Sequence, residues 1–175
     1  MEWEFSFLYA LQELHNPIMD AIMTFITKLG DDGILWIAIG IICLFLKKYR
    51  KMGWQVLLSM LFTFIIGNLI LKNIFARPRP CAIDPSIALL IPYPSEFSFP
   101  SGHSMNGMTA AIALFLNNKK IGVFAIVLAV CIGFSRMYHF VHFPTDVLGG
   151  FLVGTMVAIC VYFGYEKWQS KVYNL

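Results

Sequence analysis

The chain has 175 residues, enough for one domain, and 58% of them are hydrophobic while only 13% are charged. This composition excludes an ordinary soluble protein, and the formal net charge of +3 is too small and too scattered to indicate nucleic-acid binding. Apolar runs of about twenty residues recur and predict a protein that crosses a membrane several times. The acids Glu2 and Glu4 stand where a signal peptide would carry basic residues, so we expect the spans themselves to direct membrane insertion.

The first two predicted elements are short. Residues 3–14 are expected to form an amphipathic helix in the membrane interface, with Glu4 away from its apolar face. That apolar face consists of Trp3, Phe7, Leu11 and Leu14. The stretch 17–29 is apolar but contains Asp20, and it would cross the membrane only if the preceding helix continued into it.

Five longer apolar segments follow. We expect membrane-spanning helices at residues 33–46, 54–71, 101–116, 121–138 and 147–163. The second of these helices should continue to Ala76, where Pro78 and Pro80 stop it. The loop that comes next is of a length that is usually functional or disordered. The predicted fold class is all-α: a single domain over residues 1–175, built as an integral membrane bundle of about six transmembrane helices with an N-terminal interfacial helix.

Basic residues indicate the orientation of the bundle. They cluster at residues 47–51, at Lys119 and Lys120, and at Lys167 and Lys171. With six spans these clusters share one side, which the positive-inside rule assigns to the cytoplasm. The extracytoplasmic face then receives the loop 77–100, the start of the span at Ser101 and the connection 139–145. If residues 3–29 do not cross, the N-terminus lies outside and the other assignments hold.

The stretch 135–146 places Arg136, His142 and Asp146 at the end of a long apolar run, where polar groups are expensive. A carboxylate behind a histidine fixes the tautomer of the ring and makes it a better nucleophile or base. Arg136 adds a planar, permanently charged group that suits an oxyanion. The alternative is an interfacial cluster in which these side chains reach toward water and Asp146 begins a helix.

A second segment carries cations to the same face. Lys72, Arg77 and Arg79 have no acid close to them in the sequence, and they would repel one another unless an anion lay among them. The alternative is that they extend to lipid headgroups. In the following loop, Glu96 could screen or select a substrate, or it could simply be solvated.

A third segment begins a helix. Ser101 is a favourable N-cap, Gly102 lets the backbone approach a ligand, and the free N–H groups of a helix start bind anions. His103 would stand in the first turn, where it could donate a proton to a leaving group. The alternative is an ordinary capped helix with an interfacial histidine.

Together the three segments make a phosphate site with its own nucleophile, and they match a known signature. The chain resembles the type 2 phosphatidic acid phosphatase superfamily, in particular its membrane lipid phosphatases. The signature reads Lys, six residues, Arg-Pro; then Pro-Ser-Gly-His; then Ser-Arg, five residues, His, three residues, Asp. All three parts are present in order over residues 72–146. The matching residues are Lys72, Arg79, Pro80, Pro100, Ser101, Gly102, His103, Ser135, Arg136, His142 and Asp146.

The resemblance implies a two-step phosphate hydrolysis that needs no metal and no cofactor. His142 would attack phosphorus and form a phosphohistidine, Asp146 would orient it, and His103 would protonate the leaving oxygen and then activate water. The phosphate oxygens would be held by Lys72, Arg79, Arg136, Ser101 and the Gly102 amide. The signature position belongs to Arg79, so Arg77 is left to bind a second phosphate or a lipid headgroup. The four cysteines are not spaced as metal ligands.

The membrane setting favours a lipid substrate over a soluble one. We expect a polyprenyl diphosphate such as undecaprenyl diphosphate, with phosphatidylglycerophosphate and phosphatidic acid as alternatives. A phosphatase for soluble sugar or nucleotide phosphates is a second interpretation, and a non-catalytic lipid transporter or binder is a third. The expected location is the bacterial plasma membrane, with the site on the extracytoplasmic face. The expected partners are the bilayer and a lipid phosphate, not nucleic acid.

Overall fold

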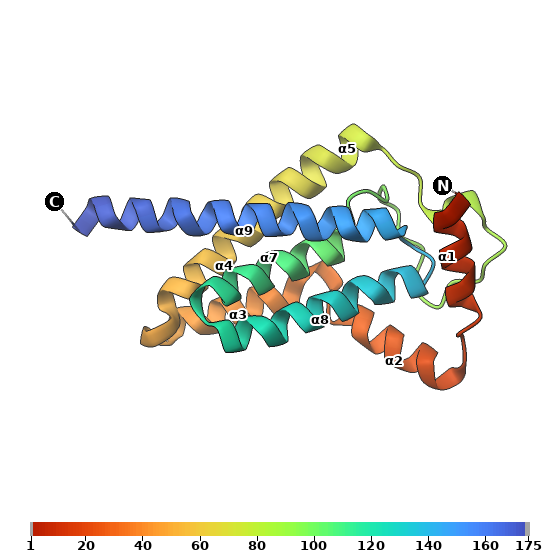
Figure 1. Cartoon of the computed structure of the whole chain (residues 1–175), viewed down its shortest axis with the longest axis horizontal. Helices are drawn as coiled ribbons and strands as arrows, with labels where there is room; N and C mark the ends of the chain where they lie inside the picture. Colours follow the sequence, from red (N-terminus) through yellow and green to blue (C-terminus); the bar gives the residue numbers. More distant parts are fainter. Residues whose placement is uncertain (1, 174–175) are drawn as a thin grey trace.

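The computed structural model describes residues 2–173, and the regular elements in that range are all helical, as predicted. The α-helices are α1 (Glu2–Gln12), α2 (Pro17–Lys28), α3 (Ile34–Phe45), α4 (Arg50–Thr63), α5 (Lys72–Phe75), α6 (Pro80–Ile83), α7 (Gly102–Asn117), α8 (Lys119–Tyr138) and α9 (Pro144–Tyr173). Figure 1 shows α3, α4, α7, α8 and α9 side by side as a bundle. Helix α1 and the loop before α7 lie across one end of it (Figure 1).

Helix α7 is the centre of the bundle, because it packs against α4, α8 and α9. Its face is built from small residues such as Ala110, which is fully buried. Gly154 of α9 lies so close to α7 that an added Cβ would be 2.5 Å from the carbonyl oxygen of Met105. Small residues let membrane helices approach closely, and close packing is what holds such helices together. The starts of α7 and α9 are thereby joined, with the Ser101 N–H donating to the Asp146 carbonyl oxygen at 3.0 Å.

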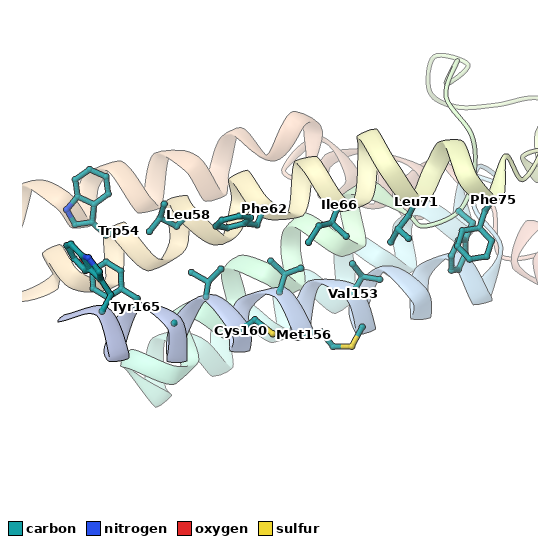
Figure 2. Close-up of a pocket in the computed structure, with 15 residues that line it drawn as sticks. Trp54, Leu58, Phe62, Ile66, Leu71, Phe75, Val153, Met156, Cys160 and Tyr165 are labelled. Atoms are coloured by element: carbon teal, nitrogen blue, oxygen red, sulfur yellow. The ribbon is translucent and has the colours of Figure 1, made fainter. Parts of the chain in front are cut away.

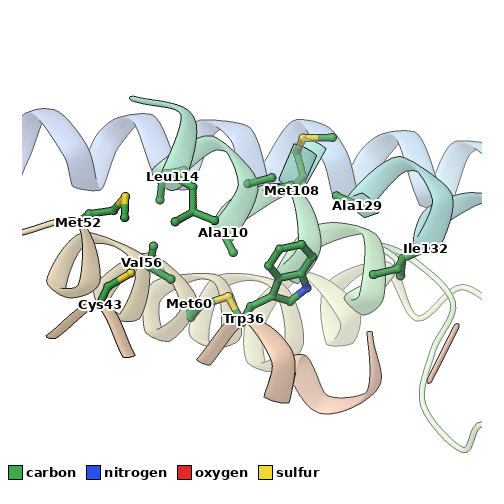
Figure 3. Close-up of a cluster of buried hydrophobic side chains, with 14 residues drawn as sticks. Trp36, Cys43, Met52, Val56, Met60, Met108, Ala110, Leu114, Ala129 and Ile132 are labelled. Atoms are coloured by element: carbon green, nitrogen blue, oxygen red, sulfur yellow. The ribbon is translucent and has the colours of Figure 1, made fainter. Parts of the chain in front are cut away.

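One apolar cluster fixes the remaining helices around α7 (Figure 3). Trp36 of α3, Val56 and Met60 of α4, and Ala129 and Ile132 of α8 are all buried in it. Because side chains of three helices meet α7 in this cluster, it positions the helix ends that carry the polar residues.

Within residues 2–173, three stretches are long and apolar enough to cross a membrane, namely Lys47–Ile83, Lys119–Tyr138 and Pro144–Val172. The first contains a π-helical segment, Phe64–Leu71, between α4 and α5, which the sequence pattern did not predict. The predicted continuation of this helix toward Ala76 is confirmed, since α5 ends at Phe75 and Ala76 turns to a φ of 41°.

The predicted N-terminal helix is present, but its packed face was not foreseen. Leu8 and Leu11 are buried against the protein, whereas Trp3 is 57% exposed. Glu4, expected on the polar face, is only 4% exposed. The sequence pattern therefore identified an apolar stripe, but the face that contacts the bundle is rotated away from it and shares only Leu11 with it.

Helices α1 and α2 are separate elements. The side chain of Asn16 caps α2 by accepting the N–H groups of Ile18 and Met19, and Pro17 occupies the first turn. The condition under which 17–29 would cross the membrane is thus not met, because the preceding helix does not continue into it.

Candidate active site

A cavity of about 690 Å³ opens at the end of the bundle where α7 begins. Its wall includes six of the eight site residues predicted from the sequence: Lys72, Arg79, Gly102, His103, Arg136 and His142. The other two, Ser101 and Asp146, are fully buried behind this wall. The fold therefore brings the three sequence segments to one place, as expected.

Three cations of the wall are almost completely buried. Lys72, Arg79 and Arg136 are 5 to 6% exposed. Arg79 Nη1 donates to the carbonyl oxygen of Val141 at 2.9 Å, and Arg136 Nη1 donates to Thr27 Oγ1 at 2.7 Å. These neutral acceptors orient the guanidinium groups but do not neutralise them, and the Arg136 Nε has no hydrogen-bond partner within residues 2–173. Buried cations of this kind are stable when an anion lies between them.

Lys72 forms an ion pair with Glu96 of the loop before α7. The side chain of Glu96 is 62% exposed, and its hydrogen bond with Lys72 holds the pKa of the Glu96 carboxyl below its ordinary value. Of the two sequence interpretations for Glu96, solvated loop acid or group at the site, the structure favours the second. An anion that enters the cavity would compete with Glu96 for Lys72.

His142 lies between a cation and a carboxylate. Arg79 Nη1 donates to His142 Nε2 at 3.0 Å, and because a guanidinium only donates, Nε2 holds the lone pair and Nδ1 the proton. Nδ1 is 3.3 Å from Ser98 Oγ and 3.7 Å from Asp146 Oδ2. Burial, followed by the charges of Arg79 and Arg136, lowers the pKa of His142 well below its ordinary value. The ring is therefore neutral, with the lone pair that a nucleophile needs among the buried cations.

Asp146 is held rigidly in the first turn of α9, which begins at Pro144, three residues before the predicted start of this span. Its Oδ2 accepts the backbone N–H of Phe143 at 2.8 Å and the hydroxyl of Ser98. Ser98 thus stands between the carboxylate and the ring of His142. Nothing in the sequence pattern distinguishes this serine, which lies in an irregular loop.

His103 has a carboxylate partner of its own that the sequence did not suggest. His103 Nε2 is 2.9 Å from Asp31 Oδ1, in the short 3-10 turn Asp31–Gly33 between α2 and α3. The backbone approaches the ring so closely that a Cβ on Gly30 would be 2.7 Å from His103 Cδ2. Within the described residues, no three His, Cys, Asp or Glu side chains are placed to hold a metal ion.

Ser101 and Gly102 were both predicted to bind the anion, but only Gly102 lines the cavity. Ser101 is the N-cap residue of α7, but its side chain makes no capping hydrogen bond, and its hydroxyl accepts from Ser104 at 3.0 Å. Gly102 does line the cavity, and a Cβ there would be 3.8 Å from Lys72 Nζ. The start of α7 therefore presents the Gly102 backbone to the cavity, while Ser101 links α7 to the rest of the protein.

Comparisons with known proteins give four findings. The sequence profile of the PAP2 superfamily matches residues 52–170. The chain is 39% identical over 161 residues to phosphatidylglycerophosphatase B of Bacillus subtilis, covering 85% of this chain and 76% of that protein. It is 32% identical over 141 residues to an undecaprenyl-diphosphatase of Sulfolobus acidocaldarius, covering 80% and 68%. The crystal structure of a transmembrane PAP2 type phosphatidylglycerolphosphate phosphatase from Bacillus subtilis superposes with a TM-score of 0.78 at 33% identity, covering 95% of this chain and 86% of that one.

Proposed function

Because the chain belongs to the PAP2 superfamily, and is a membrane hydrolase of lipid phosphate esters, we propose that it works through a phosphohistidine formed on His142. The observation that carries this proposal is the neutral, buried His142 ring, whose Nε2 lone pair lies among three buried cations. No other imidazole in the described residues has this environment.

The proposed chemistry has two steps. In the first, His142 Nε2 attacks phosphorus, the bond to the leaving oxygen breaks, and His103 gives that oxygen a proton. In the second, His103 takes a proton from water, which attacks the phosphohistidine and releases inorganic phosphate. Lys72, Arg79 and Arg136 stabilise the negative charge of the phosphoryl oxygens in both steps.

The cavities support a lipid as the substrate. The wall of the site cavity is apolar on the side of α3 and α4, where Ile37, Leu57 and Leu61 lie. A second cavity of about 1380 Å³ runs between α4–α5 and α9, from Trp54 to Phe75, and is lined almost entirely by apolar side chains (Figure 2). Both offer room for an acyl or prenyl chain beside the site. We favour undecaprenyl diphosphate, with phosphatidylglycerophosphate and phosphatidic acid as alternatives.

We further propose that the site faces the extracytoplasmic side of a bacterial plasma membrane. The basic clusters near the starts of α4 and α8 and the end of α9 lie at the end of the bundle opposite the site (Figure 1). The first turn of α2 contacts the site end through Asp20 with Tyr138, and the turn that follows α2 contacts it through Asp31 with His103. We therefore place α2 on the outer side, which leaves five crossings by α3, α4–α5, α7, α8 and α9 rather than six.

The test is phosphate release by the purified protein with EDTA present. The panel holds undecaprenyl diphosphate, phosphatidylglycerophosphate, phosphatidic acid and a soluble phosphate ester, with His142→Ala as the control. We expect release from at least one lipid, unaffected by EDTA and lost in the variant. Release that EDTA abolishes would refute the mechanism, and faster release from the soluble ester would refute the lipid assignment. Failure to release phosphate from any substrate would favour a lipid transporter or binder.

A further inference from the structure

Arg77 lies behind the site cavity and does not line it. Its Nη1 donates to Asp146 Oδ1 at 2.6 Å and to Thr145 Oγ1 at 2.7 Å, and its Nη2 donates to Glu4 Oε2 at 2.7 Å. The guanidinium also lies 4.1 Å from the centre of the Phe143 ring. A side chain held in this way does not extend to a second phosphate or to lipid headgroups, so neither alternative from the sequence holds.

Glu4 is a buried carboxylate that the N-terminal helix supplies from the far end of the sequence. Both of its oxygens are used, since Oε1 accepts from Thr145 Oγ1 at 2.6 Å and Oε2 accepts from Arg77. The neighbouring Phe5 ring packs edge-on against Phe143 with 5.2 Å between ring centres, which fixes α1 at this place. A carboxylate is costly to bury unless it is paired, and Arg77 is the partner that compensates Glu4.

The charges of this cluster do not cancel. Arg77 lies between two carboxylates, Glu4 and Asp146, so the three groups together carry one net negative charge. His142 is on the other side of Asp146. When Nε2 bonds to phosphorus while Nδ1 keeps its proton, the ring becomes a cation. An Asp146–Arg77 pair without Glu4 would present no net charge to that cation.

We propose that Glu4 is a positioning residue of the active site, which acts through Arg77 and Asp146 to keep one negative charge behind the nucleophile. Helix α1 is thereby a part of the catalytic machinery and not only a membrane anchor. This inference rests on the proposed role of His142. It predicts that the charge of Glu4 affects the formation of the phosphohistidine and not the binding of the substrate.

The first test is Glu4→Gln, which keeps the shape of the side chain and removes its charge. We expect kcat and the single-turnover rate of phosphoenzyme formation to fall by about tenfold or more, with KM changed by less than about twofold. Glu4→Asp, which restores the charge, should recover part of the rate. The matched control is Glu2→Gln, which removes the same charge from an exposed position of the same helix and should behave as the wild type.

The second test separates charge from structure. Removing the cation as well, in Glu4→Gln with Arg77→Gln, returns the cluster to one net negative charge. We expect this double variant to form the phosphoenzyme faster than Glu4→Gln alone, whereas a purely structural role predicts that the two losses add. If Glu4→Gln alone does not fold, the double variant is compared with the wild type, and a rate within about tenfold supports the proposal.

Three results would overturn the inference. They are a Glu4→Gln rate equal to that of Glu2→Gln, a loss confined to KM, and a double variant as inactive as His142→Ala. The wild type separates this test from that of the proposed function. If the wild type forms no phosphoenzyme, the proposed function fails; if it forms one and Glu4→Gln forms it equally fast, only the role of Glu4 fails.

Discussion

The site contains two histidine–carboxylate pairs that differ in almost every physical respect. The partner of His142 is Asp146, which is fully buried and accepts hydrogen bonds from Phe143, Ser98 and Arg77. The partner of His103 is Asp31, whose side chain is 53% exposed in a three-residue turn. One carboxylate is held from several directions, whereas the other is open to water.

The difference between the two carboxylates matches the two roles that the proposed mechanism gives to His142 and His103. A nucleophile needs one tautomer and one orientation throughout the cycle, and a buried carboxylate with fixed donors provides both. A group that gives a proton in one step and takes one in the next has to exchange protons between steps, which an exposed partner permits. The environment of the carboxylate, and not the histidine–carboxylate contact itself, therefore distinguishes the nucleophile from the proton-transfer group.

The largest expected effect is at the pair formed by His142 and Asp146. Asp146→Asn keeps the shape of the side chain but removes the charge behind His142 and leaves the Arg77 cation facing Glu4 alone. We expect kcat to fall by about 10²- to 10⁴-fold. Steady-state phosphate release in detergent micelles measures this effect. A loss smaller than about tenfold would mean that the charge of Asp146 contributes little to catalysis by His142.

A smaller effect is expected at the exposed pair. Asp31→Asn should lower kcat by about tenfold for a lipid phosphate, because His103 is then less able to hold its proton. The loss should nearly vanish in the single-turnover release of nitrophenol from a nitrophenyl phosphate, whose leaving oxygen needs no proton in the first step. The measurement is the ratio of the two losses. Equal losses with both substrates would contradict the role of Asp31 in proton transfer by His103.

The protonation state of His142 gives a further test of the difference between the two pairs. Since burial and the neighbouring cations lower the pKa of His142 below 6.5, the ring should stay neutral as the pH falls through that value and become charged only in more acidic solution. An NMR titration of ¹⁵N-labelled histidine in the ligand-free protein, with His142→Ala for assignment, follows this ring directly. A midpoint at or above 6.5 would contradict the neutral nucleophile.

The smallest effect concerns the ion pair between Lys72 and Glu96. Glu96→Gln removes the competitor for this cation, so we expect KM to fall by up to about fivefold with little change in kcat, as is typical of a half-exposed ion pair. Initial rates over a range of lipid concentrations in mixed micelles measure both constants. An increase in KM would show instead that Glu96 contributes to substrate binding.

The sequence was sufficient to locate six of the residues that line the site cavity. His103, Arg136 and His142 stand next to helix ends, and the spacing of polar residues at the ends of apolar runs made those ends predictable. Apart from Asp146, the partners behind them were not predictable. Ser98 lies in an irregular loop and Asp31 in a three-residue 3-10 turn, where no periodicity indicates a direction.

The prediction that Glu4 lies on the polar face of its helix was wrong for a different reason. Helical periodicity assigns acids to the polar, solvated face, but this one is buried against Arg77, 73 positions later in the chain. The π-helical segment Phe64–Leu71 likewise has no signal in the pattern of apolar residues. Long-range pairing decides the burial of Glu4, and a single sequence does not contain that information in its local spacing.

The most direct test of the division of labour between the two histidines uses His103→Ala with a ³²P-labelled nitrophenyl phosphate. This substrate needs no acid in the first step, so we expect labelled phosphohistidine to accumulate, to be stable in base and labile in acid, and to map to His142. Absence of label while nitrophenol is still released over many turnovers, or label on a residue other than His142, would contradict it.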